Sequence, residues 1–148
     1  MMTTKNLSKR KISSGIVVVR KHQDDYLFLL LRAYANWGFP KGGTEPGENL
    51  LDTALRETEE ETTITPDELN FNWGKLSRVS DPYGKGKSKI AVYFLAETDR
   101  IKVELPINPK IGKPEHDEYG WFTHKEAQKL LNQRVSKILD WANEILGK

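Results

Sequence analysis

A glycine- and proline-rich stretch that leads directly into an acidic helix limits the possible folds of this chain more than any other feature. The stretch Trp37–Gly47 holds four glycines and two prolines in eleven residues, a composition typical of a structured loop rather than a helix. Asn49 follows as a helix N-cap, with Asp52 three residues later as its capping partner. Apolar and threonine side chains then recur at helical spacing, which predicts an amphipathic helix over residues 50–62.

The remaining elements do not alternate regularly along the chain. A run of β-branched residues predicts a strand over 12–21, and the Asp24-Asp25 pair favours a turn before a second strand at 26–32. Further strands are predicted at 71–79, 89–96 and 118–122, and helices at 125–131 and 135–146. Strands, glycine loop, helix, strands and closing helices together indicate an α/β fold of the α+β type, a mixed β-sheet sandwiched between helices.

Length and composition set the remaining boundaries. The 148 residues suit one domain, which we expect over residues 12–148 after a flexible, polar N-terminus at residues 1–11. The absence of cysteine excludes disulfides, thiolate zinc sites and cysteine nucleophiles, and favours a cytoplasmic location. No run approaches the roughly 18 apolar residues of a membrane span. The net charge of +2 is unlike that of a polycationic nucleic-acid tail.

Three glutamates of the predicted helix indicate a metal site. At about 100° per residue, Glu57, Glu60 and Glu61 fall on one helical face. Carboxylates crowded together repel one another unless a cation neutralises them. Oxygen ligands favour Mg²⁺, Mn²⁺ or Ca²⁺ over zinc, so we expect Mg²⁺ with Mn²⁺ as a substitute. Arg56 is placed to pair with Glu60 one turn further along the helix.

The segment from Gly42 to Ile64 resembles the signature of the Nudix hydrolase family, the Nudix box. That pattern is Gly, five residues, Glu, seven residues, then Arg-Glu-apolar-x-Glu-Glu-x-Gly-apolar. The chain matches it in register at the following positions: Gly42, Glu48, Arg56, Glu57, Glu60, Glu61 and Ile64. Thr58 replaces an aliphatic residue and Thr63 replaces the glycine. Because a β-branched residue resists the left-handed conformation, we expect the helix to end in another geometry at Thr63.

The resemblance implies a Nudix fold and roles for the box residues. The Gly42 carbonyl and the carboxylates of the box are expected to hold the metal, while Glu48 supports the loop through Arg56. Gly43 and Gly47 let the backbone approach a ligand closely. A divalent cation at this site would polarise the phosphoryl oxygens and activate water for attack on phosphorus.

The general base stays open among three glutamates. Glu57 and Glu61 are candidates within the box, and Glu115 is the third, in the segment 113–121. Related Nudix enzymes carry a metal-binding glutamate in a similar Pro-Glu or Glu-His context before a tryptophan. Glu118 is the rival within this segment, and Glu115 is the preferred metal ligand and catalytic residue.

Outside the box, several segments resemble diadenosine tetraphosphate hydrolases, which implies cleavage of that nucleotide to ATP and AMP. They are Trp37–Gly43, Lys89 followed by Tyr93–Glu97, and Glu115-His116 before Tyr119 and Trp121. Tyr83 or Tyr119 is expected to stack on a base. Lysines are expected to contact the phosphates: Lys41, Lys85, Lys87 and Lys89.

Two other functions are kept as alternatives. RNA 5′ pyrophosphohydrolases share the Trp-x-Phe-Pro-x-Gly-Gly loop and the Pro-Glu segment, and remove pyrophosphate from 5′-triphosphorylated RNA. A non-catalytic nucleotide-sensing Nudix module is a different class, but such modules tend to lose the glutamates that are intact here. The partner is a nucleotide substrate in each case, and the sequence leaves the oligomeric state open.

Overall fold

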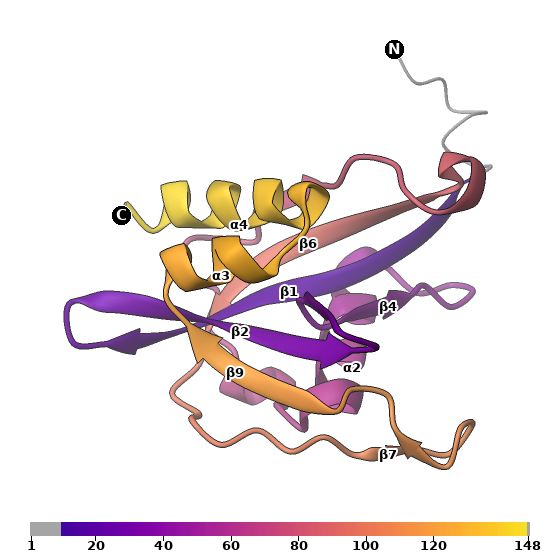
Figure 1. The fold of residues 1–148 in the computed structure, drawn as a ribbon, viewed down its shortest axis with the longest axis horizontal. Coiled ribbons are helices and arrows are strands. Elements are labelled where there is room, and N and C mark those ends of the chain that lie inside the picture. Colours follow the sequence, from indigo (N-terminus) through magenta and orange to yellow (C-terminus); the bar gives the residue numbers. More distant parts are fainter. Residues whose placement is uncertain (1–9, 148) are drawn as a thin grey trace.

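The computed structural model describes residues 10–147, which form a seven-stranded mixed sheet with helices on both faces (Figure 1). The main strand order is β3-β2-β1-β6-β5, with β4 paired to β1 and β9 paired to β2. The strands are β1 Lys11–His22, β2 Asp25–Ala33, β3 Asn36–Gly38, β4 Lys41–Gly43, β5 Ser77–Val79, β6 Lys89–Glu97 and β9 Glu118–Phe122. The predicted α+β class and mixed sheet are confirmed.

Helices cover both faces of this sheet. Helix α2 (Leu50–Thr62) lies on one face, and α3 (His124–Leu130) and α4 (Gln133–Ile145) lie on the other (Figure 1). A separate two-stranded sheet joins β7 (Ile107–Asn108) to β8 (Lys113–Pro114), and short 3₁₀ turns occupy Pro66–Glu68 and Lys85–Lys87. Among the helices of residues 10–147, none has the length and apolar character needed to cross a membrane.

Strand β1 carries the core on both of its faces. It pairs in parallel with β6 and antiparallel with β2, so it lies in the interior of the sheet. Successive side chains of a strand point to opposite faces. Ile16 and Val18 therefore pack on the α2 side, and Val17 and Val19 pack on the α4 side, all fully buried. A strand covered on both faces is expected to be continuously apolar, as Ile16–Val19 is.

The local signals in the sequence place most elements within one or two residues. Asn49 caps α2, because its side-chain oxygen accepts a hydrogen bond from the Asp52 backbone N–H at 2.8 Å. The predicted bounds 50–62 are confirmed. The predicted helix over 135–146 is α4, and apolar side chains at helical spacing bury one of its faces in the core: Val135, Ile138, Leu139 and Ala142.

Two predictions about the strands are corrected. The strand expected over 71–79 is reduced to Ser77–Val79, because Gly74 adopts a φ of 88° and donates a backbone hydrogen bond to Phe71, which turns the chain. Lys11, assigned to the flexible terminus, is the first residue of β1. The flexibility predicted for residues 1–9 lies outside the described residues.

The expected geometry at the end of α2 is also wrong. Thr63 adopts the left-handed conformation, with φ 65° and ψ 7°, as the glycine of the box would. Arg100 supplies the physical reason: its guanidinium donates to the Thr63 carbonyl at 2.6 Å, to the Thr63 hydroxyl, and to the Glu68 carboxylate at 3.0 Å. These bonds offset a conformational cost of about 1–2 kcal/mol.

Without the Arg100 guanidinium, the conformational cost at Thr63 should no longer be offset by hydrogen bonds. We expect Arg100→Ala to lower the free energy of unfolding by about 2 kcal/mol, because it removes charge-assisted hydrogen bonds. In a Thr63→Gly background the same change should cost about 1 kcal/mol, since glycine adopts the conformation unaided and lacks the hydroxyl. Urea unfolding of the four proteins measures both costs. Equal costs in the two backgrounds would show that Arg100 does not hold Thr63.

Candidate active site

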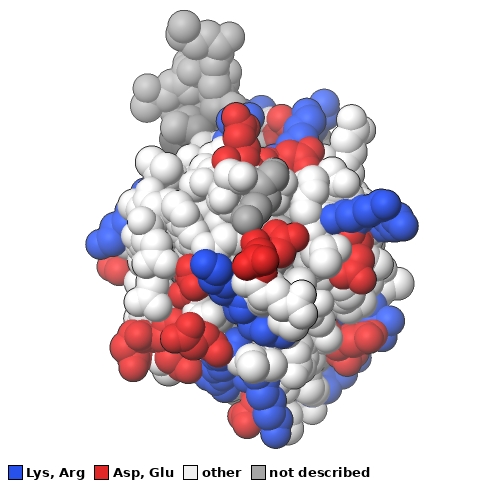
Figure 2. All heavy atoms as spheres, turned by 90° about the vertical axis from the view of Figure 1, so that its left-hand side faces the viewer, with Lys and Arg blue, Asp and Glu red and all other residues white. Residues whose placement is uncertain are grey.

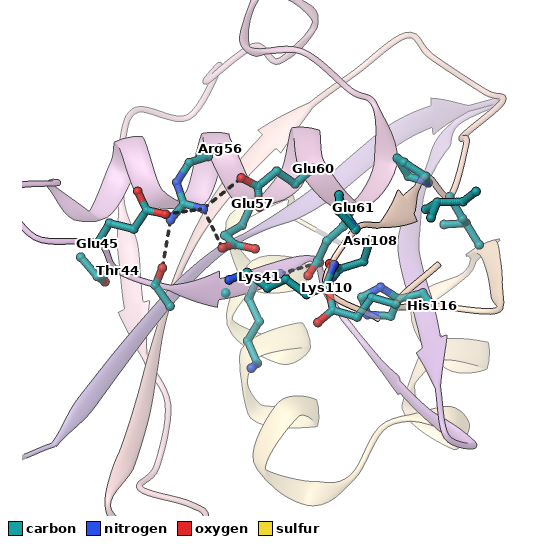
Figure 3. A pocket seen from close by; sticks show the side chains of 17 residues that line it. Lys41, Thr44, Glu45, Arg56, Glu57, Glu60, Glu61, Asn108, Lys110 and His116 are labelled. Carbon is teal, nitrogen blue, oxygen red and sulfur yellow. Dashed lines mark hydrogen bonds and ion pairs between the residues drawn. The ribbon is translucent and has the colours of Figure 1, made fainter. Parts of the chain in front are cut away.

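A cavity of about 830 Å³ opens beside α2, where β4 and the segment between residues 105 and 116 form its other walls (Figure 3). Glu57, Glu60 and Glu61 line it from the helix, and Gly42 lines it from β4. Glu115 lines it from the opposite wall. The structure thus brings together all the predicted metal ligands, from three segments that are distant in sequence.

Gly42 lies directly against the carboxylate of Glu57. A Cβ built at Gly42 would stand 2.1 Å from the Glu57 carboxyl carbon, a distance that no side chain tolerates. The neighbouring Gly43 has no such restriction, since a Cβ there meets no atom within 4 Å. Gly47 differs again, because its φ of 79° is what favours glycine in the turn before α2. Only Gly42 of the three is required by contact with a site carboxylate.

Arg56 joins the glycine loop to the helix. Its Nε and Nη2 bind both carboxylate oxygens of Glu48 at 2.8 and 2.9 Å, and Nη2 also donates to the Gly43 carbonyl at 2.9 Å. Its Nη1 donates to Glu57 at 2.8 Å and to Glu60 at 3.2 Å (Figure 3). The bond between Arg56 and Glu60 is the one predicted from helical spacing. The hydrogen bond from Arg56, above all, lowers the pKa of Glu48 to about 2.

The surroundings of Glu61 and Glu57 on α2 disfavour their charged forms. Glu61 is only 8% exposed, and burial, followed by the nearby Glu115 carboxylate, raises its pKa well above the usual range. Burial also raises the pKa of Glu57, and the charges of Glu60 and Glu115 add to the effect. Glu61 accepts one hydrogen bond, at 3.1 Å, from the Lys41 backbone N–H. A divalent cation would relieve this repulsion, so the residues present fit the metal that Nudix chemistry requires.

The two glutamates that compete in the segment 113–121 occupy different surroundings. Glu115 lines the cavity. Glu118 lies on β9 and forms an ion pair with Arg32 at 3.0 Å. His116, next to Glu115, also lines the cavity, and burial lowers its pKa. The sequence analysis did not assign His116 a role, although the Glu115-His116 pair was visible in the sequence.

Two of the predicted substrate-binding residues meet at one end of the site. Lys41 lines the cavity, and its ammonium lies 5.5 Å from the centre of the Tyr83 ring. The guanidinium of Arg134, a residue of α4, stacks at 3.9 Å from the same ring centre. Arg134 was not predicted, because its position depends on how α4 packs. One of its nitrogens, Nη1, is buried without a hydrogen-bond partner.

Of the predicted substrate-binding residues, Lys41 alone lines the cavity, Tyr83 lies beside it, and the others lie elsewhere. Tyr119 faces the α2 side of the core, where its hydroxyl accepts a hydrogen bond from the Val103 backbone N–H. Lys85 and Lys87 lie exposed in the 3₁₀ turn after Gly84. The stem of Lys89 lies against Gly84, at 3.2 Å from a Cβ built there. Successive side chains of β9 point to opposite faces of the sheet, and this alternation directs Tyr119 into the core. The geometry of the 3₁₀ turn keeps Lys85 and Lys87 outside the cavity lining.

Comparison with known proteins identifies the fold and the box together. The family model of the NUDIX domain matches residues 9–142. The chain belongs to the Nudix family. This Nudix chain is 36% identical over 132 residues to the mouse asymmetrical bis(5′-nucleosyl)-tetraphosphatase, a match that covers 83% of this chain and 86% of the mouse protein.

Two further relatives of this Nudix hydrolase bear on its substrate. The crystal structure of a Caenorhabditis elegans Ap4A hydrolase binary complex aligns with a TM-score of 0.80 and 28% identity, covering 93% of this chain and 98% of that one. An RNA pyrophosphohydrolase of Campylobacter jejuni is 29% identical over 111 residues, covering 69% of this chain and 67% of its own length.

The contact between Gly42 and Glu57 predicts a sharp difference between adjacent glycines. Gly42→Ala should lower kcat about a hundredfold, because a new methyl group displaces the Glu57 carboxylate by an ångström or more. Gly43→Ala is the matched control and should stay within about twofold of wild type. Steady-state hydrolysis of a nucleotide substrate by the two folded variants measures this. Similar activities in both would show that the position of Glu57 does not matter.

Proposed function

We propose that this Nudix hydrolase cleaves diadenosine tetraphosphate asymmetrically, releasing ATP and AMP with Mg²⁺ as cofactor. The observation that carries the proposal is the similarity to the mouse tetraphosphatase over 83% of the chain, combined with a cavity that Glu57, Glu60 and Glu61 of the box line. The Caenorhabditis elegans Ap4A hydrolase, similar over 93% of this chain, supports the same substrate.

The carboxylates around the cavity define how the reaction would proceed. Glu57, Glu60, Glu61, Glu115 and the Gly42 carbonyl would hold the cation. When bound, the cation supplies positive charge that neutralises the phosphate oxygens of the substrate. An attacking water loses a proton as its oxygen bonds to phosphorus, while the phosphoanhydride bond breaks and its oxygen departs with the leaving nucleotide. The proton acceptor would be a carboxylate oxygen of Glu57, Glu61 or Glu115.

Arg56 acts in this scheme as a positioning residue. Its guanidinium is held by Glu48 and the Gly43 carbonyl, and it orients the carboxylates of Glu57 and Glu60 through hydrogen bonds. The side chain is 25% exposed and faces three carboxylates within 3.2 Å. It therefore keeps the loop and the helix in register rather than serving as a free cation for phosphate.

Lys41 in the cavity lining and Tyr83 beside it offer a place for phosphate and base. Lys41 provides a positive charge beside Tyr83, and Arg134 adds a second on the same ring. An aromatic ring that stacks on a base contributes about 1–3 kcal/mol. We propose that Lys41 contacts a phosphate and that Tyr83 supports a base through the part of the ring that Arg134 leaves open.

The 5′ end of RNA is the second candidate substrate, and the Campylobacter jejuni relative favours it. Binding of a long RNA relies on many phosphate contacts by Lys and Arg. On the face that Figure 2 shows, which lies away from β4 and β7, these residues alternate with Asp and Glu rather than forming one basic track. That face therefore adds no continuous row of phosphate contacts for a long RNA. The intact carboxylates also favour catalysis over a sensing module, while the cytoplasmic location and the single domain over 12–148 stay predictions.

Product analysis tests the substrate directly. With Mg²⁺ and matched low concentrations of the two substrates, diadenosine tetraphosphate should be converted to ATP and AMP at least about tenfold faster than 5′-triphosphorylated RNA releases pyrophosphate. Chromatography of the nucleotides and of the RNA products measures both rates. Preferential pyrophosphate release would overturn the proposal in favour of RNA, and inactivity on both substrates would contradict it altogether.

Tyr83 should act on binding rather than on chemistry. We expect Tyr83→Ala to raise KM for diadenosine tetraphosphate about tenfold with little change in kcat, because the stacking surface is lost. Tyr83→Phe keeps the ring and is the control, with KM close to wild type. A similar rise of KM in both variants would point to the hydroxyl, and unchanged KM in both would remove Tyr83 from the substrate site.

A further inference from the structure

His116 lies close to two carboxylates of the cavity, near the C-terminal end of α2. Donor atoms of Glu61, Glu115 and His116 all lie within 4.8 Å of one another (Figure 3). Glu61 comes from the last turn of α2, whereas the other two follow β8 on the opposite wall. Side-chain rotation that draws these donors closer together would let one ion contact all three at about 2.1 Å.

This group differs in its surroundings from the other box carboxylates. Glu57 and Glu60 are already bonded to Arg56, at 2.8 and 3.2 Å. Glu61 instead accepts a hydrogen bond from the Lys41 backbone N–H at 3.1 Å and lies beside the like charge of Glu115. A cation between Glu61 and Glu115 would compensate their charge, and a ring nitrogen of His116 lies within 4.8 Å of a carboxylate oxygen of each.

The donor set determines which cation suits the position. Mg²⁺ binds almost entirely through oxygen and keeps several waters. An imidazole nitrogen suits first-row transition dications such as Mn²⁺, Co²⁺ and Zn²⁺, whose affinity for mixed nitrogen and oxygen sites exceeds that of Mg²⁺. A site of two carboxylates and one histidine therefore differs from the all-oxygen site that the box alone implies.

We propose that His116, with Glu61 and Glu115, directly ligates the divalent cation of this cavity, and that this position binds a first-row transition dication more tightly than it binds Mg²⁺. The inference rests on the proposed function, because the cation would serve the same cavity. It concerns the identity of the metal rather than the identity of the nucleotide.

The two other histidines of the chain provide matched controls. His124, the first residue of α3, is bonded through Nε2 to Asp140 at 2.9 Å. His22 ends β1 beside the turn to β2. Neither lines the cavity. Replacing His124 therefore removes an imidazole without touching the three proposed ligands.

Binding of Mn²⁺ to the full chain without nucleotide, followed by the electron paramagnetic resonance signal of free Mn²⁺, tests the proposal. Wild type and His124→Ala should bind Mn²⁺ at least about tenfold more tightly than Mg²⁺, which is added as a competitor. His116→Ala should lose at least about tenfold in Mn²⁺ affinity, with Mg²⁺ affinity unchanged within about twofold. Unchanged Mn²⁺ affinity in His116→Ala, or no preference in wild type, would overturn the proposal.

A second measurement needs no variant and so does not depend on how His116→Ala folds. Electron spin echo modulation of Mn²⁺ bound to the wild-type protein should show coupling to an imidazole nitrogen, and its absence would contradict direct ligation. Hydrolysis of diadenosine tetraphosphate in Mg²⁺ separates the two proposals. If that reaction proceeds while the nitrogen coupling is missing, the metal assignment fails and the proposed function stands.

Discussion

The geometry of the site depends on how one guanidinium is shared among several carboxylates. Arg56 binds Glu48 and the Gly43 carbonyl on the loop side, and Glu57 and Glu60 on the helix side. Because all these bonds converge on one planar group, the loop cannot shift along the helix without breaking several of them. The contact of Gly42 with the Glu57 carboxylate follows from that fixed register, as does the opening of the cavity beside α2.

The same arrangement leaves the far end of the helix face negatively charged. Arg56 satisfies Glu57 and Glu60, but Glu61 is buried one turn beyond Glu57, next to Glu115 from another segment. Burial of a charge without a partner is costly, so a fold that keeps Glu61 at 8% exposure needs an external cation for a stable ionised state. Burial of Glu61 and its ionisation are thus opposed in this region, and a bound cation would allow both.

Local periodicity explains what could be predicted from the sequence. The cap at Asn49, the bounds of α2 and the strand over 12–21 depend on neighbours within a few positions, and each was predicted to within one residue. The left-handed Thr63 could not be predicted, because it depends on Arg100, which is 37 residues away in the sequence. Tyr119 shows the same limit: only the pairing of β9 with β2 decides which face it occupies.

The wall opposite α2 has a separate role from the box. The box residues position carboxylates whose spacing the helix alone determines, so they specify phosphoanhydride chemistry in general. Residues 105–116 contribute their own donors, including Glu115 and His116, and their backbone is set by the short β7–β8 pairing rather than by the main sheet. A change of metal or nucleotide preference can therefore arise in this wall without disturbing Arg56 or the core. In the proposed metal site, the imidazole and one of the two carboxylates accordingly come from a segment that the box does not contain.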